Sequence, residues 1–279
     1  PAFWIKSDLF SRKVAIVTGG GSGIGKAISA ELLQLGHTLH FIYIIYNITL
    51  LQRITYKHLA LSFTTGIIHS TLNSAAVRNL VASTLKLHGR IDFLVNNGGG
   101  QFSSPAAGMS LKGWNAVIDT NLTGTFLCCR EVYNSWMRDH GGAIVNIIAD
   151  MWKGFPGMAH TGAARSAVDN LTKSLAIEWA DSGVRINSVA PGTIFSKTAM
   201  ENYKEIGPVL FQKAVPCIPA KRLGFPEEVS VCFLLSPAAS FISGATLKVD
   251  AGQSLYNAVW EIPGNHDNLE IVKDFKSKL

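Results

Sequence analysis

A glycine-rich turn between an expected strand and an expected helix constrains this chain more than any other feature. The turn reads TGGGSGIG and spans Thr18 to Gly25. It follows VAIVT, a short β-rich run, and precedes residues 24–35, where apolar residues recur at helical spacing. Glycines let the backbone turn tightly and approach a pyrophosphate, and a helix N-terminus favours negative charge. The pattern predicts a dinucleotide-binding turn at the start of an α/β fold.

Strand-like and helix-like stretches alternate along most of the chain, which favours an α/β fold with a mainly parallel sheet. Further strands and helices are expected at residues 39–45, 91–95, 114–137, 143–148, 162–179, 184–190 and 245–250. A chain of 279 residues that is 47% hydrophobic can bury one large core, so we predict one domain. We place it at residues 11–255, between an N-terminal extension (1–10) and a polar C-terminal tail (256–279).

Residues 37–71 do not fit this alternation beyond the expected second strand. No Asp or Glu occurs between Glu31 and Asp92, although this part of the chain should contain a surface helix. Its hydrophobic run is too short and too interrupted to cross a membrane. We interpret the stretch either as diverged or as not being native coding sequence.

The net charge and the cysteines indicate which kinds of ligand or partner this protein can bind. The net charge of +6 and the pI of about 9.2 fit a solvated basic surface or a polyanionic ligand such as a phosphorylated cofactor. The chain has no Lys/Arg-rich run and no nucleic-acid motif, which argues against nucleic acid. The four cysteines lack metal-ligand spacing and lie in apolar surroundings, so we expect buried thiols and no metal site.

The chain ends in Ser277, Lys278 and Leu279. A terminal Ser-Lys-Leu is an address that the peroxisomal import receptor reads. A chance tripeptide is the alternative, although the tail before it is polar, as an accessible tail should be. The ending therefore predicts a peroxisomal protein with the import receptor as a partner.

Several further motifs follow the glycine turn in a characteristic order. They are NNGG at Asn96–Gly99, Asn121 within DTNLTGTF, and PGTI at Pro191–Ile194. With these motifs the chain resembles the short-chain dehydrogenase/reductase family over about residues 10–36 and 72–255. The resemblance implies a Rossmann-type doubly wound parallel sheet in a single domain with a small substrate lid.

The resemblance also implies which residues bind a nicotinamide cofactor. They are Thr18, Gly19, Ser22, Gly23, Ile24, Gly25, Asn96, Asn97, Gly98, Arg165, Pro191, Gly192, Ile194 and Thr198. An acid that bonds the ribose 2′-OH, or an Arg that accepts a 2′-phosphate, usually ends the second strand, but residues 43–45 include neither. The missing acid and the nearby Lys26 favour NADPH, and the sequence leaves NADH open.

The expected catalytic helix lacks the usual residues. In most of the family a Ser after the fifth strand and a Tyr-x-x-x-Lys on the next helix protonate a carbonyl oxygen, but Ala149, Thr161 and Arg165 stand at these positions. Thr161 is too weak an acid to replace a phenol, and Arg165 stays protonated. Ketone chemistry is therefore poorly supported. Reduction of a conjugated C=C bond fits better, because the enolate that it forms needs hydrogen-bond donors.

Longer strings, among them HTGAARSAVDNLTKSLAIEWA and FLLSPAASFISG, resemble the branch of the family that reduces trans-2-enoyl-CoA with NADPH in fatty-acid chain elongation. The resemblance implies catalytic roles for Thr161, Arg165 and Asn121, the last through a water network. Some relatives carry a tyrosine where this chain has Asp169, and we expect this aspartate to face solvent. A dienoyl- or oxoacyl-thioester reductase and a catalytically weak acyl-CoA-binding protein are the alternatives.

The same resemblance implies which residues surround the substrate. Gln101, Phe102, Trp152 and Phe155 are expected around the acyl-CoA thioester, and Asn202 to Cys217 correspond to the family's lid. The family commonly pairs its two long helices between subunits, which implies a homodimer or homotetramer.

Overall fold

Seven strands form one parallel sheet in this computed structural model, which describes residues 9–35, 40–44, 65–66, 74–229 and 231–256. The order across the sheet is β3-β2-β1-β4-β5-β6-β7, and every neighbouring pair is parallel. The strands are β1 (Val14–Thr18), β2 (His40–Ile44), β3 (Thr65–Gly66), β4 (Phe93–Asn96), β5 (Gly142–Ile147), β6 (Val184–Pro191) and β7 (Thr246–Val249). The expected doubly wound fold is confirmed, and its strand order reverses between β1 and β4, where such folds bind ligands.

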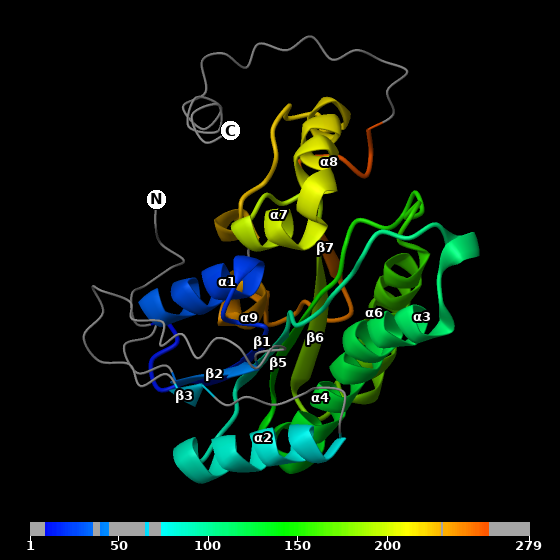
Figure 1. Ribbon diagram of the computed structural model, residues 1–279. Coiled ribbons are helices and arrows are strands. Elements are labelled where there is room, and N and C mark those ends of the chain that lie inside the picture. Colours follow the sequence, from blue (N-terminus) through cyan, green and yellow to red (C-terminus); the bar gives the residue numbers. More distant parts are fainter. Residues whose placement is uncertain (1–8, 36–39, 45–64, 67–73, 230, 257–279) are drawn as a thin grey trace.

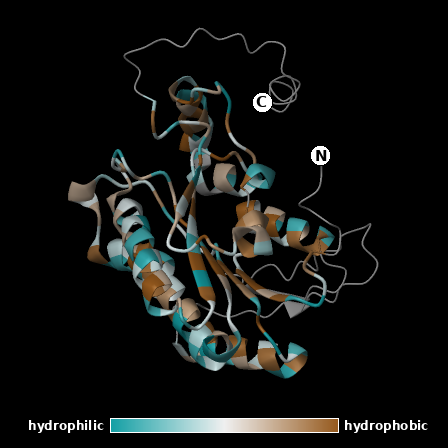
Figure 2. Ribbon diagram, turned by 180° about the vertical axis from the view of Figure 1, so that it is seen from behind, coloured by the Kyte–Doolittle hydropathy of each residue, from teal (hydrophilic) through white to brown (hydrophobic). Residues whose placement is uncertain are grey.

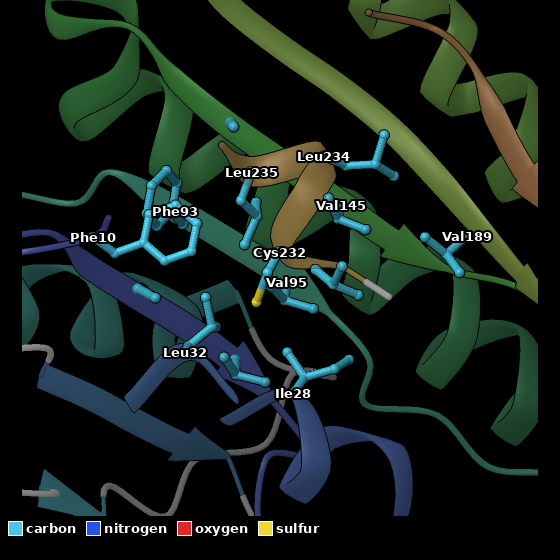
Figure 3. Close-up of a cluster of buried hydrophobic side chains, with 14 of the residues drawn as sticks. Phe10, Ile28, Leu32, Phe93, Val95, Val145, Val189, Cys232, Leu234 and Leu235 are labelled. Atoms are coloured by element: carbon cyan, nitrogen blue, oxygen red, sulfur yellow. The ribbon is translucent and has the colours of Figure 1, made fainter. Parts of the chain in front are cut away.

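Helices cover both faces of this sheet (Figure 1). The helices α1 (Gly23–Gln34) and α9 (Cys232–Leu235) close one face over a cluster that includes Ile28, Leu32 and Val95 (Figure 3). The helices α2 (Ser74–His88), α4 (Gly124–Val132) and α6 (Ala159–Glu178) cover the other face. Because both faces are covered, β1 and β4 are buried along their whole length, whereas the helices carry both hydrophobic and hydrophilic residues (Figure 2).

The helix expected around 114–137 is longer and less regular than its periodicity suggests. It begins after Ser110, whose hydroxyl accepts a hydrogen bond from the Gly113 N–H at 3.1 Å. It then runs through α3 (Leu111–Ile118), a π-helical turn η2 (Asp119–Thr123), α4, a second π-helical turn η3 (Tyr133–Met137) and α5 (Arg138–His140). π-Helical turns are rare and often mark functional sites, and η2 contains Asn121.

A small helical region lies beyond the carboxyl ends of the strands, in the position expected for the lid (Figure 1). It consists of α7 (Lys197–Tyr203), η4 (Lys204–Ile206), α8 (Gly207–Ala214) and η5 (Val215–Cys217). The buried side chains of Phe211, Ile218 and Leu223 form its own hydrophobic cluster. The remaining short helices are η1 (Ala106–Gly108), η6 (Pro226–Glu228) and η7 (Pro237–Ala239).

The N-terminal boundary of the packed domain lies earlier than expected. Phe10 is buried, its N–H donates to the Leu35 carbonyl at 3.0 Å, and its ring packs edge-on against Phe93. The domain therefore includes Phe10, which we had assigned to the extension. Most of the atypical stretch 37–71, the tail from residue 257 onward and its Ser277-Lys278-Leu279 ending lie outside the described residues.

A carboxylate at the start of β4 ties two strands together. Asp92 accepts hydrogen bonds from Arg90 at 2.6 and 2.7 Å, from Lys13 at 3.0 Å and from the Val14 N–H at 2.9 Å. Burial would raise the pKa of the Asp92 carboxyl, but these hydrogen bonds outweigh it and the pKa is lowered. The ionised carboxylate therefore stabilises the fold above the unfolded pKa of about 3.9, and this contribution is lost as the pH falls through the lower folded pKa.

We expect Asp92→Asn to lower the free energy of unfolding at neutral pH by about 1–3 kcal/mol, because the buried Val14 N–H and the more exposed Arg90 and Lys13 side chains lose a charged acceptor. Urea unfolding at neutral and acidic pH measures this. The difference between wild type and Asp92→Asn should shrink as the pH falls below about 4. A difference that stays constant as the pH falls further below about 4 would contradict the role of the ionised carboxylate.

Candidate active site

The glycine turn forms a cradle at the carboxyl end of β1. Gly19 has a φ of +65° and Gly23 a φ of +49°, conformations that favour glycine. A Cβ on Gly25 would lie 2.3 Å from the Gly19 carbonyl oxygen and 2.4 Å from Asn97 Nδ2. Ser22 is the N-cap of α1 and makes no side-chain capping bond. The turn therefore brings its backbone close to the first N–H groups of α1, the geometry that suits a pyrophosphate.

Hydrogen bonds join this turn to the NNGG loop after β4. Thr18 Oγ1 accepts from the N–H groups of Asn97 at 2.9 Å and Gly98 at 2.7 Å. Asn97 Nδ2 donates to the Thr18 carbonyl at 3.1 Å. The two loops thus border the crevice where the strand order reverses.

The resemblance places Asn96 at the cofactor, but its side chain has other partners. Its side chain is buried between strands, and its Nδ2 donates to Asn146 Oδ1 at 2.8 Å. Because the amide is used inside the sheet, a side-chain contact between Asn96 and a cofactor is no longer expected.

The three expected catalytic residues come from α6 and η2. The guanidinium of Arg165 donates to the Ile147 carbonyl at 2.5 Å and approaches Gly99 so closely that a Cβ there would lie 2.4 Å from it. The same Cβ would lie 2.9 Å from Asn121 Oδ1, which accepts from the Gly100 N–H at 2.9 Å. Arg165 and Asn121 therefore meet at the loop after β4.

Thr161 lies one turn before Arg165 on α6 and is wholly buried. Its Oγ1 has no hydrogen-bond partner among the described residues. A buried hydroxyl without a partner is unfavourable, so it is typical of a group that meets a ligand. Together with the glycine cradle, this hydroxyl fits a bound nicotinamide cofactor and its substrate.

The lid meets the loop after NNGG directly. Gln101 Nε2 donates to the Tyr203 hydroxyl, and burial raises the pKa of Tyr203 despite this hydrogen bond. The ring of Phe102 packs edge-on against His160, with ring centroids 4.5 Å apart. The sequence assigns no role to Tyr203 or His160, although Tyr203 lies in the expected lid and His160 begins the HTGAARSAVDNLTKSLAIEWA string.

Beneath the lid is a cavity of about 780 Å³. It is lined by Asp150, Lys153, Gly154, Phe155, Pro156, Met158, Cys217, Gln253, Leu255 and Tyr256. Phe155, one of the residues expected around the substrate, is among these lining residues. Trp152 is not in this lining, and the Lys248 ammonium lies 4.9 Å from the centre of its ring. The exposed Cys217 corrects the expectation of four buried thiols, which holds for Cys128, Cys129 and Cys232.

The turn after β6 connects the sheet to the lid. The Pro191 carbonyl accepts from the Asp150 N–H at 3.0 Å, and a Cβ on Gly192 would lie 2.8 Å from Asp250 Cβ. Ile194 bridges to Gly224. Thr198 lies in the first turn of α7 and thus on the lid.

Asp169 does not face solvent as expected. Its carboxylate accepts hydrogen bonds from Thr246 on β7 and from Lys173 one turn along α6, and its side chain is only 14% exposed. The Asp169 carboxylate thus joins α6 to β7, and this structural role explains why a carboxylate stands at this position.

A family model described as "Enoyl-(Acyl carrier protein) reductase" matches residues 19–254. The chain belongs to the short-chain dehydrogenase/reductase family. Nicotinamide dinucleotides are the cofactors of this family. Among the described residues, no three His, Cys, Asp or Glu side chains are grouped as a metal site, and no helix has the length and apolar character to cross a membrane.

This short-chain dehydrogenase/reductase is 37% identical to the peroxisomal 2,4-dienoyl-CoA reductase of Danio rerio, over 90% of this chain and 84% of the relative. It is also 37% identical to a 3-oxoacyl-[acyl-carrier-protein] reductase of Synechocystis, over 88% of this chain and 98% of the relative. A solved structure of a citronellol catabolism dehydrogenase from Pseudomonas aeruginosa PAO1 has a TM-score of 0.77 and 41% identity, covering 89% of this chain and 98% of that chain.

Proposed function

We propose that this protein reduces the 2,3 double bond of trans-2-enoyl-CoA thioesters with NADPH. The observation that carries the proposal is the buried hydroxyl of Thr161, which has no hydrogen-bond partner within the described part of the chain and stands where the family usually has a phenol. Arg165 follows one turn later, and position 149 has no Ser. These three positions can hold a negatively charged oxygen but lack the phenol that usually protonates that oxygen in ketone reduction. Relatives whose names include 2,4-dienoyl-CoA and 3-oxoacyl-[acyl-carrier-protein] support a thioester substrate.

The bound cofactor would supply a hydride to the β-carbon. The glycine cradle would hold the pyrophosphate at the N-terminus of α1. Thr161 Oγ1 would donate a hydrogen bond to the thioester oxygen as negative charge develops there, and the fixed charge of Arg165 would stabilise that oxygen and hold the nicotinamide ribose. Asn121 would keep the loop after β4 in place through its hydrogen bonds to Gly100 at 2.9 and 3.0 Å.

The cavity beneath the lid would take the acyl chain. Its volume of about 780 Å³ lies within the range of small-molecule sites, and Phe155, Met158 and Leu255 give it apolar walls. Gln101 and Phe102 would border the thioester where the lid touches the loop after NNGG.

Two further proposals concern the location of the enzyme in the cell and its oligomeric state. The Ser277-Lys278-Leu279 ending and the peroxisomal names of relatives support localisation in the peroxisome and recognition by its import receptor. A homodimer or homotetramer through α4 and α6 is supported by Phe126 and Ile177, which are 37% and 81% exposed.

Reduction of 2,4-dienoyl-CoA is the second candidate, because several relatives carry that name. The test is NADPH oxidation with purified protein and trans-2-decenoyl-CoA, 2,4-decadienoyl-CoA or acetoacetyl-CoA, side by side. We expect the highest kcat/KM on decenoyl-CoA. Faster turnover of the dienoyl ester would establish the second candidate, and faster turnover of acetoacetyl-CoA would refute both. Fluorescence titration with NADPH and NADH decides the cofactor.

A further inference from the structure

We propose that the carboxyl group of Asp150 delivers the proton to the α-carbon of the substrate. This inference rests on the proposed reduction of a conjugated thioester. The reaction needs an acid besides the donors at the thioester oxygen. Neither Thr161 nor Arg165 supplies it, because Thr161 is too weak and Arg165 does not release its proton. The acid must therefore be another group that borders the substrate.

Four titratable groups line the cavity beneath the lid: Asp150, Lys153, Cys217 and Tyr256. The Lys153 ammonium donates to the Tyr256 carbonyl, and Cys217 is an exposed residue at the end of the lid. The Tyr256 ring lies under the Lys221 ammonium at 5.1 Å, directly after Leu255, which is 80% exposed. Lys153 and Cys217 are thus exposed, and Tyr256 follows an exposed residue.

Asp150 lies on the side of the cavity next to the sheet. It follows β5 by three residues, beside the position where the family's Ser would stand. Its N–H donates to the Pro191 carbonyl at 3.0 Å, on the turn expected beside the nicotinamide. The same residue lines the cavity together with Phe155 and Met158. Asp150 thus lies between the expected hydride donor and the expected acyl chain.

Burial and one neighbouring carboxylate raise the pKa of Asp150. Burial raises the pKa of Asp150 and the negative charge of Asp250 raises it further, against smaller opposing effects of Lys248, Lys153 and the Trp152 N–H. Burial acts in the same direction on Asp250, but hydrogen bonds from Ser254 and from the Gly252 N–H outweigh it and lower the pKa of Asp250. A pair of carboxyls whose pKa values are pushed apart is the arrangement of an acid beside a fixed charge.

The proposed reduction consists of a hydride addition followed by a proton transfer. Hydride addition at the β-carbon carries both electrons of the reduction and leaves an enolate, whose oxygen Thr161 and Arg165 stabilise. The O–H bond of Asp150 then breaks as a C–H bond forms at the α-carbon, which gives the saturated thioester. Asp150 is left as a carboxylate and regains its proton from solvent, so each turnover consumes one reduced cofactor and one proton.

The experiment compares wild type with Asp150→Asn and Asp150→Glu, and with Asp139→Asn as a control because Asp139 is an exposed aspartate on α5. We expect Asp150→Asn to lower kcat on decenoyl-CoA at least about 100-fold, with little change in KM, and Asp150→Glu to recover part of it. Wild-type kcat should fall as the pH rises through the raised pKa of Asp150, and this fall should be absent from Asp150→Asn. Thermal unfolding checks that the variants are folded.

An infrared pH titration of the cofactor-free protein gives a second readout that does not depend on turnover. The carbonyl band of protonated carboxyls should persist above the ordinary aspartate pKa of about 3.9 in wild type. It should be weaker in Asp150→Asn, where the Glu31 carboxyl, whose pKa burial also raises, still contributes. Undiminished activity of Asp150→Asn, or identical infrared titrations, would overturn the role of Asp150 alone. A wild type that binds NADPH but reduces no thioester would overturn the proposed function, and this role with it.

Discussion

Replacing Gly25 by alanine is expected to weaken NADPH binding at least about 100-fold. The new Cβ would lie 2.3 Å from the Gly19 carbonyl oxygen and 2.4 Å from Asn97 Nδ2. The first of these atoms is backbone and cannot turn away, so the whole turn must shift against α1. Loss of two charge-assisted hydrogen bonds to a pyrophosphate, each about 1.5–3 kcal/mol, gives a change of this size.

Fluorescence titration with NADPH measures the change, and Gly108→Ala is the matched control. Gly108 lies in η1, has no atom within 4 Å of its Cβ position, and does not require a positive φ. The control should bind NADPH as wild type does, and circular dichroism should show both variants folded. Equal affinity of Gly25→Ala and Gly108→Ala would show that the cofactor does not lie against this turn.

The sequence predicts the sheet well because its strands are buried on both faces. A parallel strand under two helix layers reads as a continuous apolar run, and VAIVT is such a run, buried at every position. The glycine turn is equally predictable from the sequence, because its close contacts permit only glycine at position 25. Local sequence patterns of this kind predict both the secondary-structure element and its expected role.

The chemistry around the cavity is harder to read, because it depends on contacts between distant segments. Asp150 and Asp250 are a hundred residues apart and influence each other only after β5 and β7 have joined the same sheet. The contact between Gln101 and Tyr203 likewise spans the loop after β4 and the lid. Asp169 was expected to face solvent because helical spacing shows which face a residue occupies and not that β7 reaches it.

Thr161→Val is expected to separate a catalytic role from a structural one. Valine has nearly the shape of threonine but lacks the hydroxyl, which is buried and has no partner among the described residues. Removing it deletes a donor to the thioester oxygen, so kcat on decenoyl-CoA should fall about 100-fold while NADPH affinity changes little. The free energy of unfolding should stay the same or rise by up to about 1 kcal/mol, because an unsatisfied buried hydroxyl is unfavourable.

Thr172→Val is the matched control on the same helix. Thr172 is equally buried, but its hydroxyl donates to the Val168 carbonyl at 2.8 Å and accepts from Asn146 Nδ2 at 2.9 Å. Its substitution should lower the free energy of unfolding by about 1–3 kcal/mol and leave kcat nearly unchanged. Urea unfolding and steady-state rates on both variants measure the four values. If Thr161→Val loses stability as Thr172→Val does and keeps its rate, the Thr161 hydroxyl serves the fold and not the reaction.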